Sequence, residues 1–391
     1  MPPAKYPSFR YKTVDAWRGV ACLLVVLCHS VQDFLAHVVG GSDRAVVSVL
    51  KVIHLGSIGV PMFFVISGYC IAATACVAHD RRTSLKTYMS RRFRRIYPPY
   101  WAMLGSLVAL FLLVDVVIAP GVWTSRGLLR PWWFSPGQWF GNLTLIETWR
   151  WHVAGRPFGH ILFQSWTLCY EEQFYFIIGL LLLFPRRMFF PLIAGVTAGV
   201  VVVQQLAAAN HVNLSGFFFD GYWFAFSFGI AIFYAMNYLE RFGQIVIGLG
   251  LALTIPVVLS LPGLDNARLG FSLAMSLALA AGFAVLLLAL RQHDDAIARQ
   301  KWLSPLFVCG KMSYSLYLIH GVVLMFAIPL CLKIGAVSAW SRLLFVMPAC
   351  VVCSLAAAWL FYRVVEQRFL NSATGTERAG DVRTATAPAL A

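Results

Sequence analysis

Long apolar segments recur along the whole of this 391-residue chain, and they constrain its fold more than any other feature. Hydrophobic residues make up 60% of the chain and charged residues only 12%, which is about half the charged share of a soluble domain. Such segments cross a bilayer as helices, because a helix pairs its backbone polar groups internally. We therefore expect an all-α polytopic membrane protein with about ten transmembrane helices.

The expected transmembrane helices cover residues 14–38, 55–79, 96–119, 164–185, 189–208, 221–239, 244–262, 269–290, 305–332 and 340–364. The first has charges at both ends and no small-residue cleavage site after it, so we interpret it as a membrane helix and expect no cleavable signal peptide. We divide the chain into a cytoplasmic basic arm, a transmembrane domain and a disordered cytoplasmic tail: 1–13, 14–370 and 371–391. The longest loop, 120–163, is rich in Trp, Gly and Pro, which suits a membrane interface.

The net charge of +15 is distributed as a topology signal. With ten spans, about 21 Lys and Arg residues lie on the side of the two termini and about nine on the other side. Cytoplasmic loops carry this excess, so we expect both termini inside the cell and loop 120–163 outside it. The positive charge then needs no nucleic-acid partner. The nine cysteines fall mostly in apolar runs and indicate neither a disulfide framework nor a zinc site.

Arg18 and His29 belong to the first expected helix and are eleven residues apart. On an α-helix they share one face, with His29 about 16 Å further along the axis. If Arg18 lies at a membrane edge, His29 lies near the middle of a bilayer core about 30 Å thick, where an ionisable residue indicates a functional site. The alternative is a histidine hydrogen-bonded to a neighbouring helix. Asp33 could orient the imidazole, or could cap the outer end of the helix.

The basic segment 81–95 ends with Arg92 and Arg95, three residues apart. They share a helix face if the helix begins before Pro98 and Pro99, which fit either a first turn or a break. Two guanidinium groups at a cytoplasmic mouth can each bind a phosphate through two hydrogen bonds, which suits a thioester donor with a nucleotide. The alternative is that this segment is only a topology signal.

Two carboxylates, Glu171 and Glu172, open the fourth expected helix, on the non-cytoplasmic side. Acidic groups near a helix N-terminus are favoured by the helix dipole, which is the structural explanation. The functional interpretation is that Glu171 points into a cavity facing His29. Tyr170, beside them, is a candidate for the lining of that cavity.

A second polar wall is expected in the ninth helix, where hydroxyls and a histidine recur within SYSLYLIH. The alternative there is hydrogen bonding between helices, worth about 1 kcal/mol or less for each contact. The candidates for the lining of a site are therefore Asp33, Tyr170, Tyr314, Tyr317 and His320.

Taken together, these motifs resemble the membrane acyltransferase-3 family, integral-membrane O-acyltransferases that modify sugars, lipids and some antibiotics. The resemblance rests on VDAWRGVACLLVVLCHS, FFVISGY, RRFRRIYPPY, SWTLCYEEQFYF and SYSLYLIH, in order across residues 14–320. The family's basic residue, ten residues and then His correspond to Arg18 and His29. Its Arg-x-x-Arg corresponds to Arg92 and Arg95. Its Glu before a Phe-Tyr pair corresponds to Glu171.

The chain departs from the family pattern in three places: Ala16 replaces Gly, Thr167 replaces Ser, and Glu366-Gln-Arg368 lacks the Pro of Glu-x-Pro. The last departure leaves the geometry of the final helix end open. We expect the stand-alone form of the family, without the soluble esterase-like domain of some relatives. Acceptor specificity would then reside in the membrane domain and in loop 120–163.

The resemblance implies a membrane-bound O-acyltransferase that moves an acyl group, expected to be acetyl, from cytoplasmic acyl-CoA to a hydroxyl. The acceptor would be a glycan, a glycolipid or a glycosylated small molecule. It implies His29 as the catalytic base, with Glu171 positioning the acceptor or orienting His29. It also implies that Arg18, Arg92 and Arg95 bind acyl-CoA.

The same resemblance leads us to expect a multi-pass protein of a bacterial cytoplasmic membrane, with the bilayer, the donor and the acceptor as partners and no metal. Direct transfer and a covalent acyl-enzyme both stay open. So does the alternative of a transporter or flippase, in which the same polar residues would line a substrate path.

Overall fold

The computed structural model describes residues 11–36, 43–115, 130–154, 159–212, 214, 216–260, 272–335 and 338–371. Every regular element in these ranges is a helix, which confirms the all-α fold. Most of the expected basic arm, the first part of loop 120–163 and the expected tail after 371 lie outside the described residues.

The longer helices are α1 (Val14–Ala36), α2 (Arg44–His54), α3 (Gly59–Asp80), α4 (Leu85–Leu113), α8 (Trp166–Leu181), α9 (Phe189–Ala209), α10 (Tyr222–Tyr238), α11 (Arg241–Ser260), α12 (Leu273–Leu290), α15 (Ser313–Lys333) and α17 (Met347–Phe361). Shorter α-helices are α6 (Pro136–Leu143), α7 (Glu147–Ala154), α13 (Asp294–Ala298), α14 (Ser304–Lys311), α16 (Ala339–Ser341) and α18 (Gln367–Asn371). Single 3₁₀ turns are η1 (Leu55–Ile58), η3 (Pro131–Trp133), η4 (Phe163–Ser165), η5 (Arg186–Met188), η6 (Phe217–Asp220), η7 (Arg291–His293) and η8 (Lys301–Leu303), and π turns are η9 (Arg342–Val346) and η10 (Tyr362–Glu366).

Eight helical stretches of the described chain are long and apolar enough to cross a bilayer: Val14–Ala36, Arg44–Asp80, Leu85–Leu113, Arg186–Ala209, Arg241–Ser260, Leu273–Ala298, Ser313–Lys333 and Ala339–Leu370. The protein is therefore a polytopic membrane protein. The other two expected spans correspond to α8 and α10, which have 16 and 17 residues. The count of ten spans and the cytoplasmic placement of both termini stay predictions.

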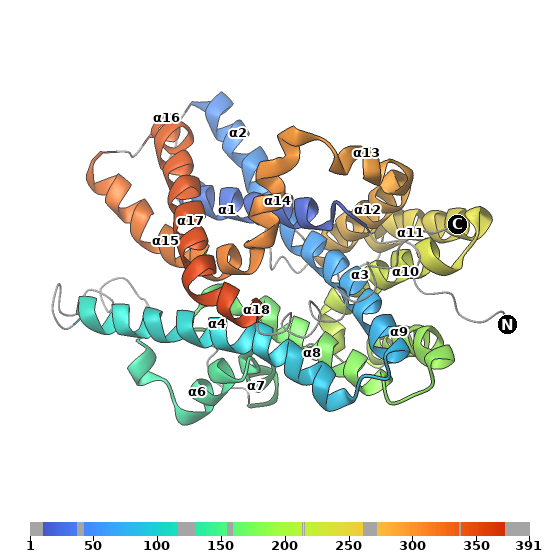
Figure 1. Cartoon of the computed structure of the whole chain (residues 1–391). Helices are drawn as coiled ribbons and strands as arrows, with labels where there is room; N and C mark the ends of the chain where they lie inside the picture. The colour runs from blue at the N-terminus through green and yellow to red at the C-terminus, as the bar shows by residue number, and fades with distance from the viewer. Residues whose placement is uncertain are drawn as a thin grey trace, which may run out of the picture.

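Helix α1 lies at the centre of the bundle and packs against α2, α3, α14, α15 and α17 (Figure 1).

Close approach of helix backbones depends on glycines, as is usual between membrane helices. At the crossing of α3 and α10, a Cβ on Gly68 would lie 2.0 Å from the carbonyl oxygen of Phe226, and a Cβ on Gly229 would lie 2.0 Å from that of Val65. Larger side chains at these two positions would force the helices apart.

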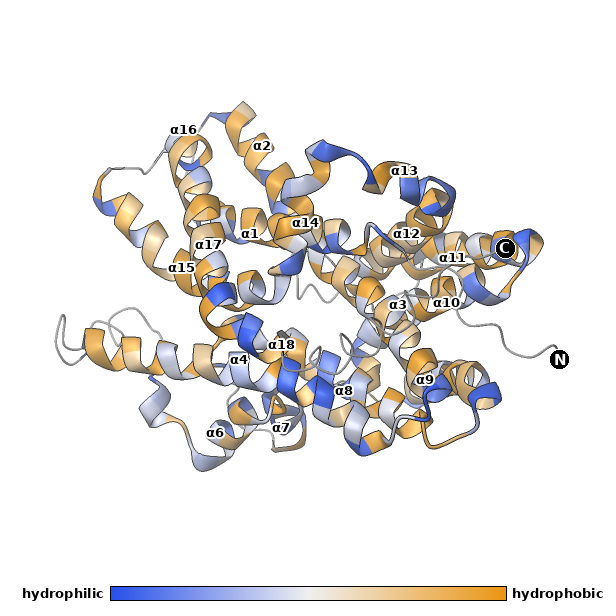
Figure 2. Cartoon of the chain, in the orientation of Figure 1, coloured by the Kyte–Doolittle hydropathy of each residue, from blue (hydrophilic) through white to orange (hydrophobic). Residues whose placement is uncertain are grey.

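Helix α4 begins at Leu85, eleven residues before the expected start at 96. The Ser84 side chain caps it by accepting a hydrogen bond from the backbone N–H of Thr87 at 3.2 Å. Lys and Arg are good helix formers, so the basic segment continues the apolar helix instead of forming a loop. Pro98 and Pro99 consequently lie inside α4, neither in its first turn nor at a break. Figure 2 shows the hydrophilic first half of α4 and its hydrophobic second half.

Two other differences concern the helices around α1. Helix α2 occupies part of the expected loop before 55, and its side chains approach α1. The expected helix 305–332 is divided at Met312 into α14 and α15. Close to this division, Gly310 of α14 lies against α1 so closely that a Cβ there would overlap the carbonyl oxygen of Asp15.

Candidate active site

A large cavity opens between α1, α2, α3, α4, α8 and α15, with about 1780 Å³ of empty space, part of it open to solvent. Eight of the ten residues proposed from the sequence line it: Arg18, His29, Arg92, Arg95, Glu171, Tyr314, Tyr317 and His320. They come from four helices that are far apart in the sequence. The tertiary structure therefore brings together motifs whose proximity the sequence does not show.

One end of the cavity holds Arg18. Its guanidinium group forms an ion pair with Asp15 at 3.2 Å and donates a hydrogen bond to the Sγ atom of Cys70 at 3.4 Å. Arg18 is half-buried and lines the cavity, and its partner Asp15 lies one turn earlier in α1. Since α1 is continuous from Val14 to Ala36, the helix rise keeps His29 about 16 Å away along the axis.

Arg92 enters the same end of the cavity from α4. It donates a hydrogen bond to the Oγ1 atom of Thr74 at 2.5 Å, and its guanidinium carbon lies 4.9 Å from the centre of the Tyr175 ring. A cation held over an aromatic face keeps its charge with less water around it. Arg95, one turn further along α4, is exposed at the mouth of the cavity.

Glu171 lies among these arginines. Its Oε1 atom accepts hydrogen bonds from the Tyr175 hydroxyl and from Ser67 Oγ, the latter at 3.2 Å. It is close enough to Arg18 and Arg92 to interact with both electrostatically. Glu171 therefore balances part of the positive charge at this end.

His29 lies toward the other end, beside a second histidine. The ring centres of His29 and His320 are 5.5 Å apart, and the two ring planes are inclined at 62°. The Nδ1 atom of His320 lies 3.0 Å from the carbonyl oxygen of Leu316, which can only accept, so Nδ1 carries the hydrogen. This bond fixes the ring of His320 and leaves its Nε2 atom without that hydrogen in the neutral form.

The tyrosines of α15 join the walls of the cavity. The Tyr314 hydroxyl donates to the carbonyl oxygen of Ile96 at 2.7 Å, which connects α15 with α4. The Tyr317 hydroxyl donates to the carbonyl oxygen of Gln164 and lies 2.9 Å from Oγ1 of Thr167. Thr167, where the family pattern has Ser, thus keeps a hydroxyl at this position, and this hydroxyl connects α8 with α15.

The structure does not bring Asp33 and Tyr170 to the cavity lining. Asp33 is exposed near the end of α1 and interacts electrostatically with Arg342 of η9. Tyr170 is buried behind the wall, where its hydroxyl donates a hydrogen bond to Asp220 and its ring packs edge-on against that of Tyr222. On an α-helix, adjacent residues differ by about 100°, so Tyr170 and Glu171 face different surroundings.

Several cavity residues were not singled out in the sequence: Cys28, His54, Ser67, Cys70, Thr74, Gln164 and Tyr175. Tyr175 could have been predicted from the sequence, because it lies one helical turn after Glu171 and so shares its face. His54 could hardly have been predicted, because the segment that forms α2 was expected to be a loop.

Glu366 is the Glu of the family's Glu-x-Pro pattern, in which this chain lacks the Pro, and it is 3% exposed. Its carboxylate accepts hydrogen bonds from the backbone N–H of Ser315, at 3.0 Å, and from the Ser315 hydroxyl. The end of the last helix is therefore fixed to α15 without the proline.

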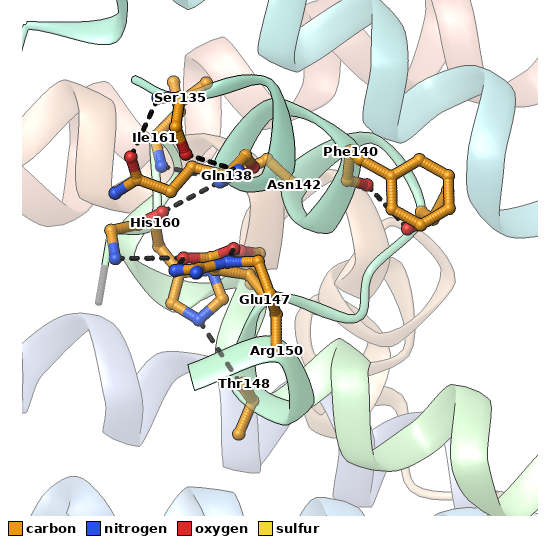
Figure 3. Close-up of polar contacts among 12 residues, drawn as sticks. Ser135, Gln138, Phe140, Asn142, Glu147, Thr148, Arg150, His160 and Ile161 are labelled. Atoms are coloured by element: carbon orange, nitrogen blue, oxygen red, sulfur yellow. Dashed lines mark hydrogen bonds and ion pairs between the residues drawn. The ribbon is translucent and has the colours of Figure 1, made fainter. Parts of the chain in front are cut away.

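The connection between α4 and α8 is folded around a buried ion pair, shown in Figure 3. Arg150 donates two hydrogen bonds of 2.7 Å to the carboxylate of Glu147, which is fully buried and also accepts from the backbone N–H of Gly159. Asn142 donates to the carbonyl oxygen of Gly159 at 2.8 Å and accepts from the N–H of Ile161 at 2.9 Å. These contacts fold the described part of loop 120–163 into a compact unit.

His160 joins this unit to η4, which lines the cavity. Its ring nitrogens lie 3.0 Å from Ser165 Oγ and 3.4 Å from Thr148 Oγ1. Burial, together with the nearby charge of Arg150, lowers the pKa of His160 to about 3. A neutral His160 thus holds the cavity rim at physiological pH.

Within the described residues, no group of three or more His, Cys, Asp or Glu side chains is arranged to hold a metal ion.

Comparison with known proteins identifies the relatives of this chain. It is similar to the exopolysaccharide production protein ExoZ of Rhizobium meliloti (strain 1021), with 29% identity over 158 residues, which cover 39% of this chain and 43% of ExoZ. It is similar to the acyltransferase MdmB of Streptomyces mycarofaciens, with 27% identity over 239 residues, which cover 58% of this chain and 54% of MdmB.

The O-acetyltransferase OatA of Staphylococcus aureus (strain NCTC 8325 / PS 47) is 23% identical over 313 residues, which cover 69% of this chain and 46% of OatA. The chain thus spans about half the length of these curated relatives. Among solved structures, no significant match was found. A family model described as an acyltransferase domain matches residues 11–363, which is most of the chain, and the protein therefore belongs to the acyltransferase-3 family of membrane acyltransferases.

Proposed function

We propose that this protein transfers an acyl group, in the first instance acetyl, from acyl-CoA to a hydroxyl of a glycan, a glycolipid or a glycosylated small molecule. The observation that carries the proposal is the division of one cavity into a guanidinium end and an imidazole end, about 16 Å apart along α1. An acyl-CoA molecule has the same division, with phosphates at one end and a reactive thioester at the other.

The guanidinium end suits the phosphates of coenzyme A. Among the residues that line the cavity, Arg18, Arg92 and Arg95 are positively charged and Glu171 is the one carboxylate, while Asp15 pairs with Arg18 from outside the lining. Guanidinium groups bind phosphates through paired hydrogen bonds, and their charge survives partial burial. Glu171 then serves mainly to hold Tyr175 and Ser67 and to position the arginines that it neighbours.

The imidazole end suits the chemical step. His29 would take the proton from the acceptor hydroxyl as that oxygen attacks the thioester carbonyl, a role that general bases fill in many transferases. His320 confines the His29 ring, and its own ring is fixed by Leu316. A base that is already oriented needs little rearrangement when the acceptor arrives.

The acceptor class is proposed from the relatives. The name of ExoZ refers to exopolysaccharide production, and a further relative, 31% identical over 132 residues, is the peptidoglycan O-acetyltransferase OatA of Listeria monocytogenes. Both concern sugar polymers, which offer many hydroxyls and no thioester of their own. We place the enzyme in a bacterial cytoplasmic membrane, with the donor arriving from the cytoplasm.

The test uses purified protein in lipid nanodiscs with acetyl-CoA and a panel of oligosaccharide and glycoside acceptors. We expect release of free coenzyme A that depends on an acceptor, together with an acetyl ester on the acceptor seen by mass spectrometry. Movement of a glycolipid across proteoliposomes without release of coenzyme A would overturn the proposal in favour of a transporter. Comparison of glycans from cells with and without the gene then names the natural acceptor.

A further inference from the structure

A thiol and an imidazole meet in the same cavity, next to the proposed base. The Sγ atom of Cys28 lies 3.4 Å from the Nδ1 atom of His54, and both residues line the cavity. Cys28 directly precedes His29 in α1, and His54 is the last residue of α2. Cys28 is 3% exposed and His54 is half-buried, so the pair is shielded from bulk water but faces the cavity space.

The backbone around Gly56 makes this contact possible. Turn η1 follows His54 directly and lies against α1, and a Cβ on Gly56 would come within 2.2 Å of the carbonyl oxygen of Leu24 and 3.4 Å of Cys28 Cβ. Only a residue without a Cβ allows this approach. The close packing holds the end of α2, and with it the imidazole of His54, beside the Cys28 sulfur.

The two other cysteines of the cavity have different partners. Cys22 Sγ lies 3.5 Å from the carbonyl oxygen of Ser313, and Cys70 Sγ accepts a hydrogen bond from Arg18. Of the three cysteines in this cavity, Cys28 is therefore the one whose sulfur contacts an imidazole. A thiol beside an imidazole is the arrangement that activates cysteine nucleophiles, because the imidazole takes the thiol proton.

We propose that Cys28 and His54 form an acyl relay, an inference that rests on the function proposed above. The Cys28 sulfur attacks the carbonyl carbon of acyl-CoA, and its proton passes to His54 Nδ1. The bond from that carbon to the sulfur of coenzyme A breaks, and the departing thiolate takes the proton from His54. The products are free coenzyme A and a thioester on Cys28, so one thioester replaces another and no further reactant is needed.

The second half-reaction uses His29. The acceptor hydroxyl attacks the carbonyl carbon of acyl-Cys28 and gives its proton to His29. The bond between that carbon and the Cys28 sulfur breaks, the ester is released, and the proton returns from His29 to the sulfur. The relay lets coenzyme A leave the guanidinium end before an acceptor occupies the imidazole end, which is ping-pong kinetics.

The experiment uses the full-length protein in nanodiscs with [¹⁴C]acetyl-CoA and no acceptor, followed by an acid quench. We expect label on the protein, its release by neutral hydroxylamine as for a thioester, and one added acetyl mass on the peptide that contains Cys28. Addition of acceptor should discharge the label into product. Because this labelling measurement uses the unaltered protein, its result does not depend on whether a variant folds.

The variants Cys28→Ala and Cys28→Ser should lose the hydroxylamine-labile label and about tenfold or more of the transfer rate, and His54→Gln should slow the labelling. Cys350→Ala is the matched control, since it removes a fully buried thiol of α17 that is outside the cavity lining. This variant should keep both the labelling of the protein and the transfer of acetyl to the acceptor.

Transfer by the unaltered protein without labelled Cys28, or full transfer by a folded Cys28→Ala protein, would overturn the relay and leave the proposed acyltransferase function standing. Absence of any coenzyme A release from the unaltered protein with every acceptor would overturn both.

Discussion

The centres of the imidazole rings of His29 and His320 lie 5.5 Å apart with the ring planes inclined at 62°, although one ring belongs to α1 and the other to α15. His320 is held by Leu316, whereas His29 faces the cavity from the middle of a continuous helix. The pair marks the imidazole end of the cavity, about 16 Å along α1 from Arg18.

Replacement of His29 by Gln should lower acyl transfer by about 100- to 10,000-fold, which is the usual contribution of a general base. Binding of acyl-CoA should be nearly unchanged, because the phosphates are proposed to bind at the other end of the cavity. Steady-state kinetics with separate binding measurements check this, and His211→Gln, at an exposed position after α9, is the control. Near-normal transfer by His29→Gln would contradict the assignment.

Replacement of Arg92 or Arg95 by Gln should raise the KM for acyl-CoA by about tenfold to 100-fold, the effect of losing a hydrogen bond to a charged group. The maximal rate should change less. Arg91→Gln is a matched control on the same helix, since Arg91 is exposed and does not line the cavity. An equal effect of all three substitutions would indicate that the basic segment acts only as a topology signal.

Replacement of Glu171 by Gln should alter the KM for acyl-CoA more than the maximal rate, because its neighbours are Arg18 and Arg92. The reference variant is Glu172→Gln, on a different face of α8, where Glu172 accepts a hydrogen bond from Tyr97 at 3.4 Å. A loss confined to the maximal rate would instead favour a direct action of Glu171 on acceptor or base.

Replacement of Arg150 by Ala should destabilise the protein by about 3 kcal/mol or more, because it leaves the buried carboxylate of Glu147 without its cation. Thermal unfolding in nanodiscs measures the change. By comparison, Lys12→Ala breaks the ion pair with Asp295, whose side chains are 62% and 59% exposed, and should leave the melting temperature nearly unchanged. Equal effects would mean that the buried pair contributes no more than a surface pair.

The pH dependence of stability should contain a contribution from His160. Its pKa is about 3 in the folded protein, below the ordinary value near 6.5, so the unfolded chain binds a proton that the folded chain does not. This contribution to stability is complete above about pH 6.5 and is lost progressively as the pH falls toward 3. Melting temperatures of the unaltered protein and of His160→Asn over that range test this, and a flatter profile is expected for the variant.

The sequence by itself determined the all-helical membrane fold, because apolar runs of this length have few other stable structures. It also determined which residues to examine, since an ionisable group at membrane depth requires a reason. Arg18 and His29 could be placed on one face from helix geometry alone, because both belong to one unbroken helix.

Only the tertiary structure decided which helices meet. Helix periodicity assigns a side chain to a face of its own helix and says nothing about the neighbour of that face. For this reason the sequence could not tell that Glu171 joins the arginines, that Tyr170 turns away, or that His54 reaches Cys28. Those contacts depend on backbone approaches at positions such as Gly56, where the absence of one carbon atom sets the distance between segments.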